Sequence, residues 1–155
     1  MKIFAKNKKA YFNYEILETF EAGISLIGQE VKSIKSGRIN LNGSYVVLRQ
    51  SENKKGSPEV FLVGTTVPPY QPKNAPSDYN PERSRKLLLN RSEIKHLIGK
   101  TKQKGMSLVP LRAYAKRGKI KIEFGIGKGK KKADKRESIK KREVEKEMRR
   151  AMKSI

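Results

Sequence analysis

The 155-residue sequence contains no cysteine and a single histidine, His96. The absence of cysteine excludes disulfides, thiolate zinc sites and cysteine nucleophiles together. One histidine also leaves too few ligands for a histidine-based metal site and no relay for a serine nucleophile. No set of nucleophile, base and stabilising group can be assembled from the remaining residues. The sequence therefore predicts neither an enzyme nor a bound cofactor or metal.

Long apolar runs are also missing. The N-terminal residues 1–6 are too short and too polar for a signal peptide, and no window is apolar enough to span a bilayer. A membrane-surface protein would need a lipidation signal or a strongly amphipathic basic helix, and neither is clear in the sequence. We expect a cytoplasmic protein.

Acidic residues are scarce relative to basic ones. The chain has 15 Asp and Glu against 37 Lys and Arg, a formal net charge of +22. Self-repulsion of that size indicates a polyanionic partner, and nucleic acid is the obvious one. Contacts to phosphate carry no base information, so structure-specific recognition has to come from other residues.

Alternation of apolar and polar residues predicts a β-rich core in residues 1–127. The segment 10–26 reads as two strands or one long bent strand. The clearest hairpin joins 106–114 to 120–127 through the dipeptide Arg117-Gly118. Shorter strands are expected at 44–49, 60–64 and 83–89. Residues 51–58 read as an exposed hairpin loop, and the proline-rich segment 66–82 as a long surface connection.

Two short helices interrupt this pattern. Ile27, Val31 and Ile34 are spaced for one helix face, with Gly37 as its stop. Asn90 with Glu93 three residues later forms a capping pair for a second helix, which ends before residue 105. Strands at this spacing with two helical inserts indicate an antiparallel closed barrel resembling an oligonucleotide-binding fold.

The composition changes abruptly after Gly127. Residues 128–155 carry 13 Lys and Arg against 5 Asp and Glu, a net charge of +8, and no aromatic residue. So few apolar groups cannot offset the ordering entropy of about 1–2 kcal/mol per residue. We expect a basic C-terminal tail that is disordered or conditionally helical. A helix would align Val144, Met148, Met152 and Ile155 on one side.

Several motifs favour an ordinary structural role over chemistry. The glycines of 125–130 lack the spacing of a phosphate loop and favour a flexible hinge. Glu15, Glu18 and Glu21 are solvated carboxylates of a barrel face, because a strand turns Glu18 away from the other two. His96 lacks an orienting partner in the sequence and is expected at the surface or in packing.

Tyrosines lie among the basic residues, where some can stack on unpaired bases and about half are expected to be core or rim residues. They are Tyr11, Tyr14, Tyr45, Tyr70, Tyr79 and Tyr114.

Three segments, in this order, resemble the SsrA-binding protein (small protein B) family over nearly the whole chain. They are Phe20–Ile24 continuing through Gly28–Ser33, Arg83–Asn90, and Gly129–Arg136. The resemblance implies a barrel that binds the tRNA-like domain of transfer-messenger RNA (tmRNA) and delivers it to stalled ribosomes for trans-translation. It also implies that the tail acts in the decoding site and mRNA channel of the small subunit, that elongation factor Tu is a partner through the RNA, and that the protein is a monomer.

The resemblance carries over Glu21, Leu88 and Asn90 as RNA-binding residues and Lys130, Lys131, Asp134, Lys135 and Arg136 as ribosome-contacting residues. Other residues of the three segments and the tail complete two sets of candidates. Those expected to bind RNA are Glu21, Lys32, Arg83, Arg85, Lys86, Leu88 and Asn90. Those expected to contact the ribosome are Gly129, Lys130, Lys131, Asp134, Lys135, Arg136, Lys140 and Arg142. Strand-face packing for Leu88 and simple solvation for the tail are the alternative interpretations.

Three positions depart from the family pattern. The hairpin near 54–58 looks longer than usual, Asn80 replaces an aspartate often found before Pro81, and Ala133 replaces an imidazole or aromatic residue of some relatives. Ala133 therefore cannot supply a stacking side chain. By composition alone, a structural ribosomal or nucleoid protein would look much the same, and an RNA-cleaving enzyme is the third reading.

Overall fold

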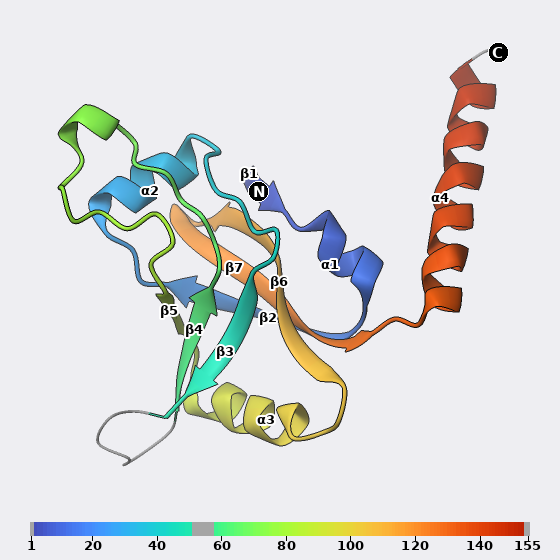
Figure 1. Ribbon diagram of the computed structural model, residues 1–155, viewed down its shortest axis with the longest axis horizontal. Coiled ribbons are helices and arrows are strands. Elements are labelled where there is room, and N and C mark those ends of the chain that lie inside the picture. The colour runs from blue at the N-terminus through green and yellow to red at the C-terminus, as the bar shows by residue number, and fades with distance from the viewer. Residues whose placement is uncertain (1, 51–57, 154–155) are drawn as a thin grey trace.

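The computed structural model describes residues 2–50 and 58–153 and shows a β-barrel with helices around it and a separate C-terminal helix (Figure 1). In chain order the elements are β1 (Lys2–Lys6), α1 (Lys8–Asn13), β2 (Tyr14–Ile24), α2 (Gly28–Lys35), β3 (Tyr45–Arg49), β4 (Glu59–Val63), the short 3-10 helix η1 (Pro72–Asn74), β5 (Arg85–Leu88), α3 (Arg91–Thr101), β6 (Met106–Lys116), β7 (Lys119–Gly129) and α4 (Lys132–Lys153).

The strands form one antiparallel sheet in the order β1-β6-β3-β4-β5-β2-β7. Because β7 also pairs with β6, the sheet closes on itself, and β1 is added outside the ring along β6. Closure removes free strand edges, which would otherwise pair with other chains. The predicted antiparallel closed barrel is confirmed.

Strands β6 and β7 form a long hairpin within the barrel. It pairs from Met106↔Lys128 to Lys116↔Lys119, and its turn holds Arg117 and Gly118 at φ 52° and 76°. This confirms the predicted hairpin. On its other side β7 pairs with β2 from Tyr14↔Gly129 to Gly23↔Lys121.

The glycines of β7 are not a hinge, contrary to the sequence-based interpretation. Gly125 and Gly127 are buried within the strand. A Cβ at Gly125 would lie 2.8 Å from Ile16 Cγ2, and one at Gly127 would lie 2.9 Å from Tyr14 Cβ. Glycine is needed there because β2 crosses β7 closely.

The barrel interior is filled by alternate residues of its strands, including Leu62 of β4 and Ile122 and Phe124 of β7, all fully buried. Ile34 of α2 and Leu97 of α3 join the same cluster. Burying each such side chain stabilises the fold by about 1.5–3 kcal/mol relative to exposure. Both predicted helices are thus packed elements of the core.

The sequence reading missed the N-terminal elements. Residues 10–13 of the predicted strand belong to α1, and residues 14–24 form one strand, β2, with a bulge between Ile16 and Glu18. Helix α1 is capped by the buried Asn7, whose Oδ1 accepts from Ala10 N at 3.3 Å. Its Nδ2 donates to the carbonyl oxygens of Leu41 at 3.3 Å and Pro110 at 2.9 Å. Those partners lie far away in sequence, so no local pattern indicates the cap.

The tail forms a single helix, α4, which is the helical form predicted as one alternative for it. Strand β7 before it ends at Gly129, two residues beyond the predicted boundary at Gly127. Almost all its described side chains are exposed, including Val144, Met148 and Met152. Figure 1 shows α4 standing apart from the barrel on the far side of α1. No helix in the described ranges is long and apolar enough to cross a membrane.

Candidate nucleic-acid interface

A shallow groove of about 380 Å³ lies on the outer face of the barrel, where β2 meets β5 and the β6–β7 turn. Its floor is apolar and its rim carries three lysines. The lining residues are Gly23, Ile24, Leu26, Val31, Lys35, Leu88, Gly118, Lys119, Ile120 and Lys121. An apolar floor with a basic rim suits a nucleotide chain, whose bases are apolar on their faces and whose phosphates are anionic.

The groove is built by strand register. Leu88 of β5 pairs with Gly23 of β2, Gly23 pairs with Lys121 of β7, and Lys121 pairs with Tyr114 of β6. Directly paired residues point to the same face of a sheet, so these side chains form a row across four strands. Gly23 leaves a gap in that row between Leu88 and Lys121.

Leu88 is the apolar wall of the groove. Its side chain is 54% exposed, although the neighbouring Leu87 is buried in the core. A Cβ on Gly23 would lie 3.4 Å from Leu88 Cβ, in van der Waals contact, so Leu88 packs over Gly23 of β2. Strand-face packing accounts for the contact of Leu88 with Gly23 but leaves about half of the Leu88 side chain exposed.

Asn90 lies two residues beyond Leu88 and caps α3. Its Oδ1 accepts from Glu93 N at 2.9 Å and from Ser92 Oγ at 2.7 Å, and Glu93 Oε1 accepts from Asn90 N at 3.2 Å. The predicted capping pair is confirmed. Within the described part of the chain, the exposed Asn90 Nδ2 donates no hydrogen bond, so it is open to a partner.

Glu21 holds Tyr114, the last residue of the row, and Lys116 of the same strand. Tyr114 donates its hydroxyl to Glu21 Oε2, and Lys116 Nζ donates to Glu21 Oε1 at 3.2 Å. The Tyr114 hydrogen bond, with help from Lys116, lowers the pKa of Glu21 despite the opposing effect of burial. Burial and the Glu21 contact raise the pKa of Tyr114 in turn. Glu21 therefore stays ionised and fixes Lys116 at the base of the turn.

Arg85 was predicted to bind RNA, but the structure buries it completely. Its Nε donates to Glu30 Oε2 at 2.6 Å, and its other nitrogens donate to the carbonyl oxygens of Thr65 at 2.8 Å and Pro81 at 2.9 Å. A buried guanidinium is tolerated here because every contact is a charge-assisted hydrogen bond. Arg85 therefore cannot touch RNA in this conformation, and it ties β5 to α2 through Glu30.

Glu30 links Arg85 to a second predicted residue, Arg83. Arg83 Nη2 donates to Glu30 Oε1 at 2.6 Å, and Glu30 Oε1 also accepts from the backbone N–H of Ile27 at 3.0 Å. Burial acts to raise the pKa of Glu30, but hydrogen bonds from Arg83, the Ile27 N–H and Arg85 outweigh it and hold that pKa below its ordinary value. This cluster is where the first two resemblance segments meet in space.

The other predicted RNA-binding residues lie apart from the groove. Lys32 is exposed on α2, and Lys86 is exposed on β5 and lies 3.9 Å from Glu59 Oε1. The sequence reading missed the rim lysines Lys35, Lys119 and Lys121. Alternation in the β7 segment placed Lys121 on the polar face, but its nearness to Leu88 depends on the β2–β7 register.

The predicted ribosome-contacting residues follow one another along the end of β7 and the start of α4. Gly129 ends the strand, and the Lys130 backbone N–H donates to Asn13 O at 2.9 Å. Lys135 and Arg142 lie over the Phe12 ring at 6.0 and 5.4 Å from its centroid. The exposed side chains include Lys131, Arg136 and Lys140. The Asp134 and Ala133 side chains and the loop at 51–57 lie outside what the structure describes.

His96 has a partner that the sequence reading did not find. Its Nε2 lies 2.9 Å from Glu18 Oε2, and its ring centroid is 6.0 Å from that of Phe20. The pair attaches α3 to β2. In the described residues no group of three or more His, Cys, Asp and Glu side chains is placed to hold a metal ion.

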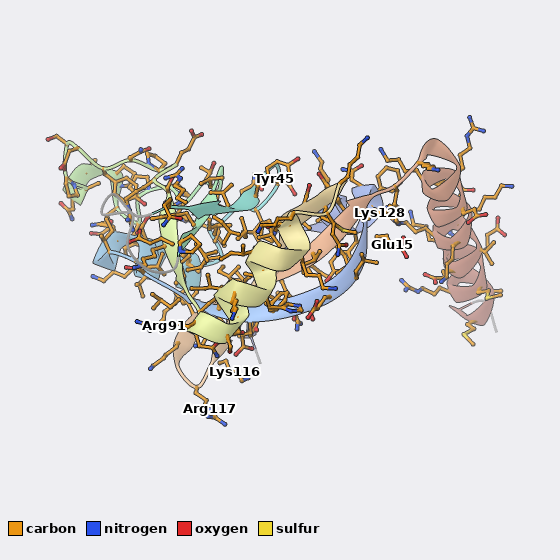
Figure 2. All side chains as sticks on the ribbon, turned by 90° about the horizontal axis from the view of Figure 1, so that it is seen from below. Glu15, Tyr45, Arg91, Lys116, Arg117 and Lys128 are labelled. Atoms are coloured by element: carbon orange, nitrogen blue, oxygen red, sulfur yellow. The ribbon has the colours of Figure 1, made fainter. Side chains whose placement is uncertain are left out.

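The tyrosines divide as expected into structural and exposed residues. Tyr114 is buried, and Tyr79 donates its hydroxyl to Val67 O at 2.7 Å. Tyr14 and Tyr45 bring their hydroxyl oxygens within 3.3 Å of each other. Figure 2 shows Tyr45 on the opposite side of the molecule from Lys116 and Arg117. The remaining exposed tyrosines are Tyr11 and Tyr70.

Comparison with known proteins shows similarity over nearly the whole chain. The model of the SmpB protein family matches residues 4–154. SsrA-binding proteins from Nostoc sp. strain PCC 7120 and Acaryochloris marina are 48% and 47% identical, each over at least 98% of this chain and 94% of the relative. A solved structure described as "tmRNA-SmpB: a journey to the center of the bacterial ribosome" matches with a TM-score of 0.63 and 40% identity, over 87% of this chain and 93% of that one.

Proposed function

The chain belongs to the SmpB protein family, and on that basis we propose that it binds tmRNA and acts with it on the ribosome in trans-translation. The relatives carry the name SsrA-binding protein, and the matching solved structure combines tmRNA and SmpB in the bacterial ribosome. The structural observation that carries the proposal is the groove along the row of Leu88, Gly23 and Lys121, which has an apolar floor and a basic rim.

The groove supplies both kinds of contact that a folded RNA needs. Lys119 and Lys121 neutralise phosphates, and Leu88 packs against an unstacked base or a ribose. The open amide Nδ2 of Asn90 donates to a base edge or a sugar hydroxyl. Glu21 acts through the groups it holds, because its carboxylate is occupied by Tyr114 and Lys116.

The tail performs the second part of the proposed function. We assign α4 and the residues leading to it to the decoding site and mRNA channel, where a polyanionic wall can neutralise its cations. The division into a core of residues 1–127 and a tail of residues 128–155 is part of this proposal. The protein acts as a monomer in the cytoplasm, meets elongation factor Tu through the RNA, and works by binding without turnover.

Asn90 provides the sharpest test of the groove. Asn90→Ser keeps a side-chain cap for α3 but loses the amide donor, whereas Asn90→Ala loses both. If the amide contacts RNA, both variants bind the tRNA-like domain about tenfold more weakly, and only Asn90→Ala loses about 1 kcal/mol of folding stability. Gel-shift titrations at one salt concentration and urea unfolding separate the two effects.

Wild-type binding has to prefer the tRNA-like domain over a random RNA duplex of equal length. Equal affinity for both RNAs would favour a structural ribosomal or nucleoid protein. Unchanged binding by Asn90→Ser would remove Asn90 from the interface.

A further inference from the structure

A second basic cleft lies between α1 and α4, away from the groove. It has a volume of about 420 Å³ and is lined by Lys6, Lys8, Tyr11, Arg142, Glu145, Lys146 and Arg149. The four α4 residues are spaced i, i+3, i+4 and i+7, which places them on one face of the helix. We call this feature the α1–α4 cleft.

The charges across the α1–α4 cleft are unbalanced. Two lysines on one wall face three cations on the other, and Glu145 is the single carboxylate. Within the described residues none of these five cations is paired with an acidic side chain. Like charges brought together repel unless an anion lies between them.

Two contacts hold the cleft walls in place. The Phe12 ring of α1 receives both Lys135 and Arg142 of α4, at 6.0 and 5.4 Å from its centroid. These two residues are seven positions apart and share the helix face that lines the cleft. Cation–π contacts of this kind contribute about 0.5–1 kcal/mol each at exposed sites. Phe12 therefore links the basic face of α4 to α1.

We propose that the α1–α4 cleft binds a single strand of RNA, with its phosphates between the two basic walls and a base against the Tyr11 ring. Tyr11 is 38% exposed and lines the cleft, so its ring is available for stacking. Core and tail thereby hold one RNA segment jointly. The inference rests on the proposed RNA-binding function but concerns a surface separate from the groove.

The test compares two double variants of the full-length protein. Lys146→Gln with Arg149→Gln removes two charges from the cleft, whereas Lys141→Gln with Arg150→Gln removes one lysine and one arginine from the same helix outside it. The ligand is a fluorescent oligouridine of about 12 nucleotides, within the site sizes of single-strand binders. Its dissociation constant is measured by fluorescence anisotropy at several salt concentrations.

We expect the cleft variant to lose about tenfold in affinity and the control about twofold. The salt slope falls by about 1.4 in the cleft variant, because two phosphate contacts to a single strand are lost. A third variant, Phe12→Leu, leaves the charge unchanged and also weakens oligouridine binding. Equal losses in the two double variants, or wild-type binding by Phe12→Leu, would overturn the proposal.

Titration of the same variants with the tRNA-like domain separates this proposal from the preceding one. If the variants bind that domain normally but the two double variants lose oligouridine affinity equally, the result contradicts the cleft proposal and leaves the proposed function intact. A wild-type protein without preference for that domain contradicts the proposed function, whatever the cleft variants do.

Discussion

The groove and the tail are both strongly basic, yet their cations are held in very different ways. Lys121 is fixed by pairing of β7 with strands on both sides, and Lys116 is held by a carboxylate. In α4, by contrast, Lys135 and Arg142 meet the barrel only through one aromatic ring among the described contacts. In the proposed function, phosphate attraction supplies affinity to both regions, but only fixed geometry supplies choice among RNA structures. The groove is therefore suited to recognition, and the tail to following a polyanionic channel.

The largest expected effect comes from removing the buried carboxylate of Glu30 on α2, the helix that supplies Val31 and Lys35 to the groove. Glu30→Ala leaves Arg85 buried without its partner, so we expect a loss of about 3–5 kcal/mol in the free energy of unfolding. Glu147→Ala on α4, an exposed site, should change it by no more than about 0.5 kcal/mol. Urea denaturation measures both values. Similar values for the two variants would mean that the groove is no more rigidly supported than the tail.

Truncation after Gly129 tests the division of labour directly. Because the barrel pairing ends at Gly129, we expect the truncated protein to fold and to bind the tRNA-like domain within about threefold of the full chain. It should fail to support peptide tagging on stalled ribosomes, as measured in a reconstituted translation system. Full tagging activity would contradict a separate function of the tail.

Two lysines of β7 test whether RNA affinity depends on a contact in the groove or only on net charge. Lys121→Gln should weaken binding to the tRNA-like domain about tenfold, and Lys128→Gln less than about twofold, because only Lys121 lines the groove. Both variants remove one positive charge from β7. Equal losses in filter binding at fixed salt would indicate that net charge, and not position, determines affinity.

The smallest expected effect concerns acid stability at Glu21. Its pKa is lowered in the folded protein by the Tyr114 and Lys116 hydrogen bonds, so its contribution to stability is present above the unfolded value of about 4.3. That contribution is lost as pH falls below about 4.3 toward the lower folded pKa. Glu21→Gln removes this titration, so its Tm should fall less steeply than that of the wild type over this range. Calorimetry at several pH values measures the two slopes, and parallel slopes would show that Glu21 gains no stabilisation from its partners.

The sequence predicts the structural elements that depend on interactions between residues close together in the chain. The β6–β7 hairpin and the Asn90 cap were predicted because alternation, the turn dipeptide and the capping pair all lie within a few residues. Helix α1 was missed because Asn7 is held by the carbonyls of Leu41 and Pro110. Such long-range partners leave no periodic signal.

The site residues show the same limit. Arg85 is predicted to bind RNA, which requires it at the surface, although it shares the inward face of β5 with the buried Leu87. The two-residue alternation of this strand therefore indicates that Arg85 points inward. Lys121 was missed for the opposite reason, because its position beside Leu88 follows from strand pairing across β2.

Strand β7 also fixes the spacing between the two basic regions. Lys121 near its start lines the groove, and Gly129 at its end leads into the tail. Eight residues of strand at about 3.3 Å each give a rod of about 26 Å. Because β7 is clamped by neighbours on both sides, this rod cannot shorten or bend freely. If RNA binds in the groove as proposed, this length sets the distance between the bound RNA and the point where the tail departs.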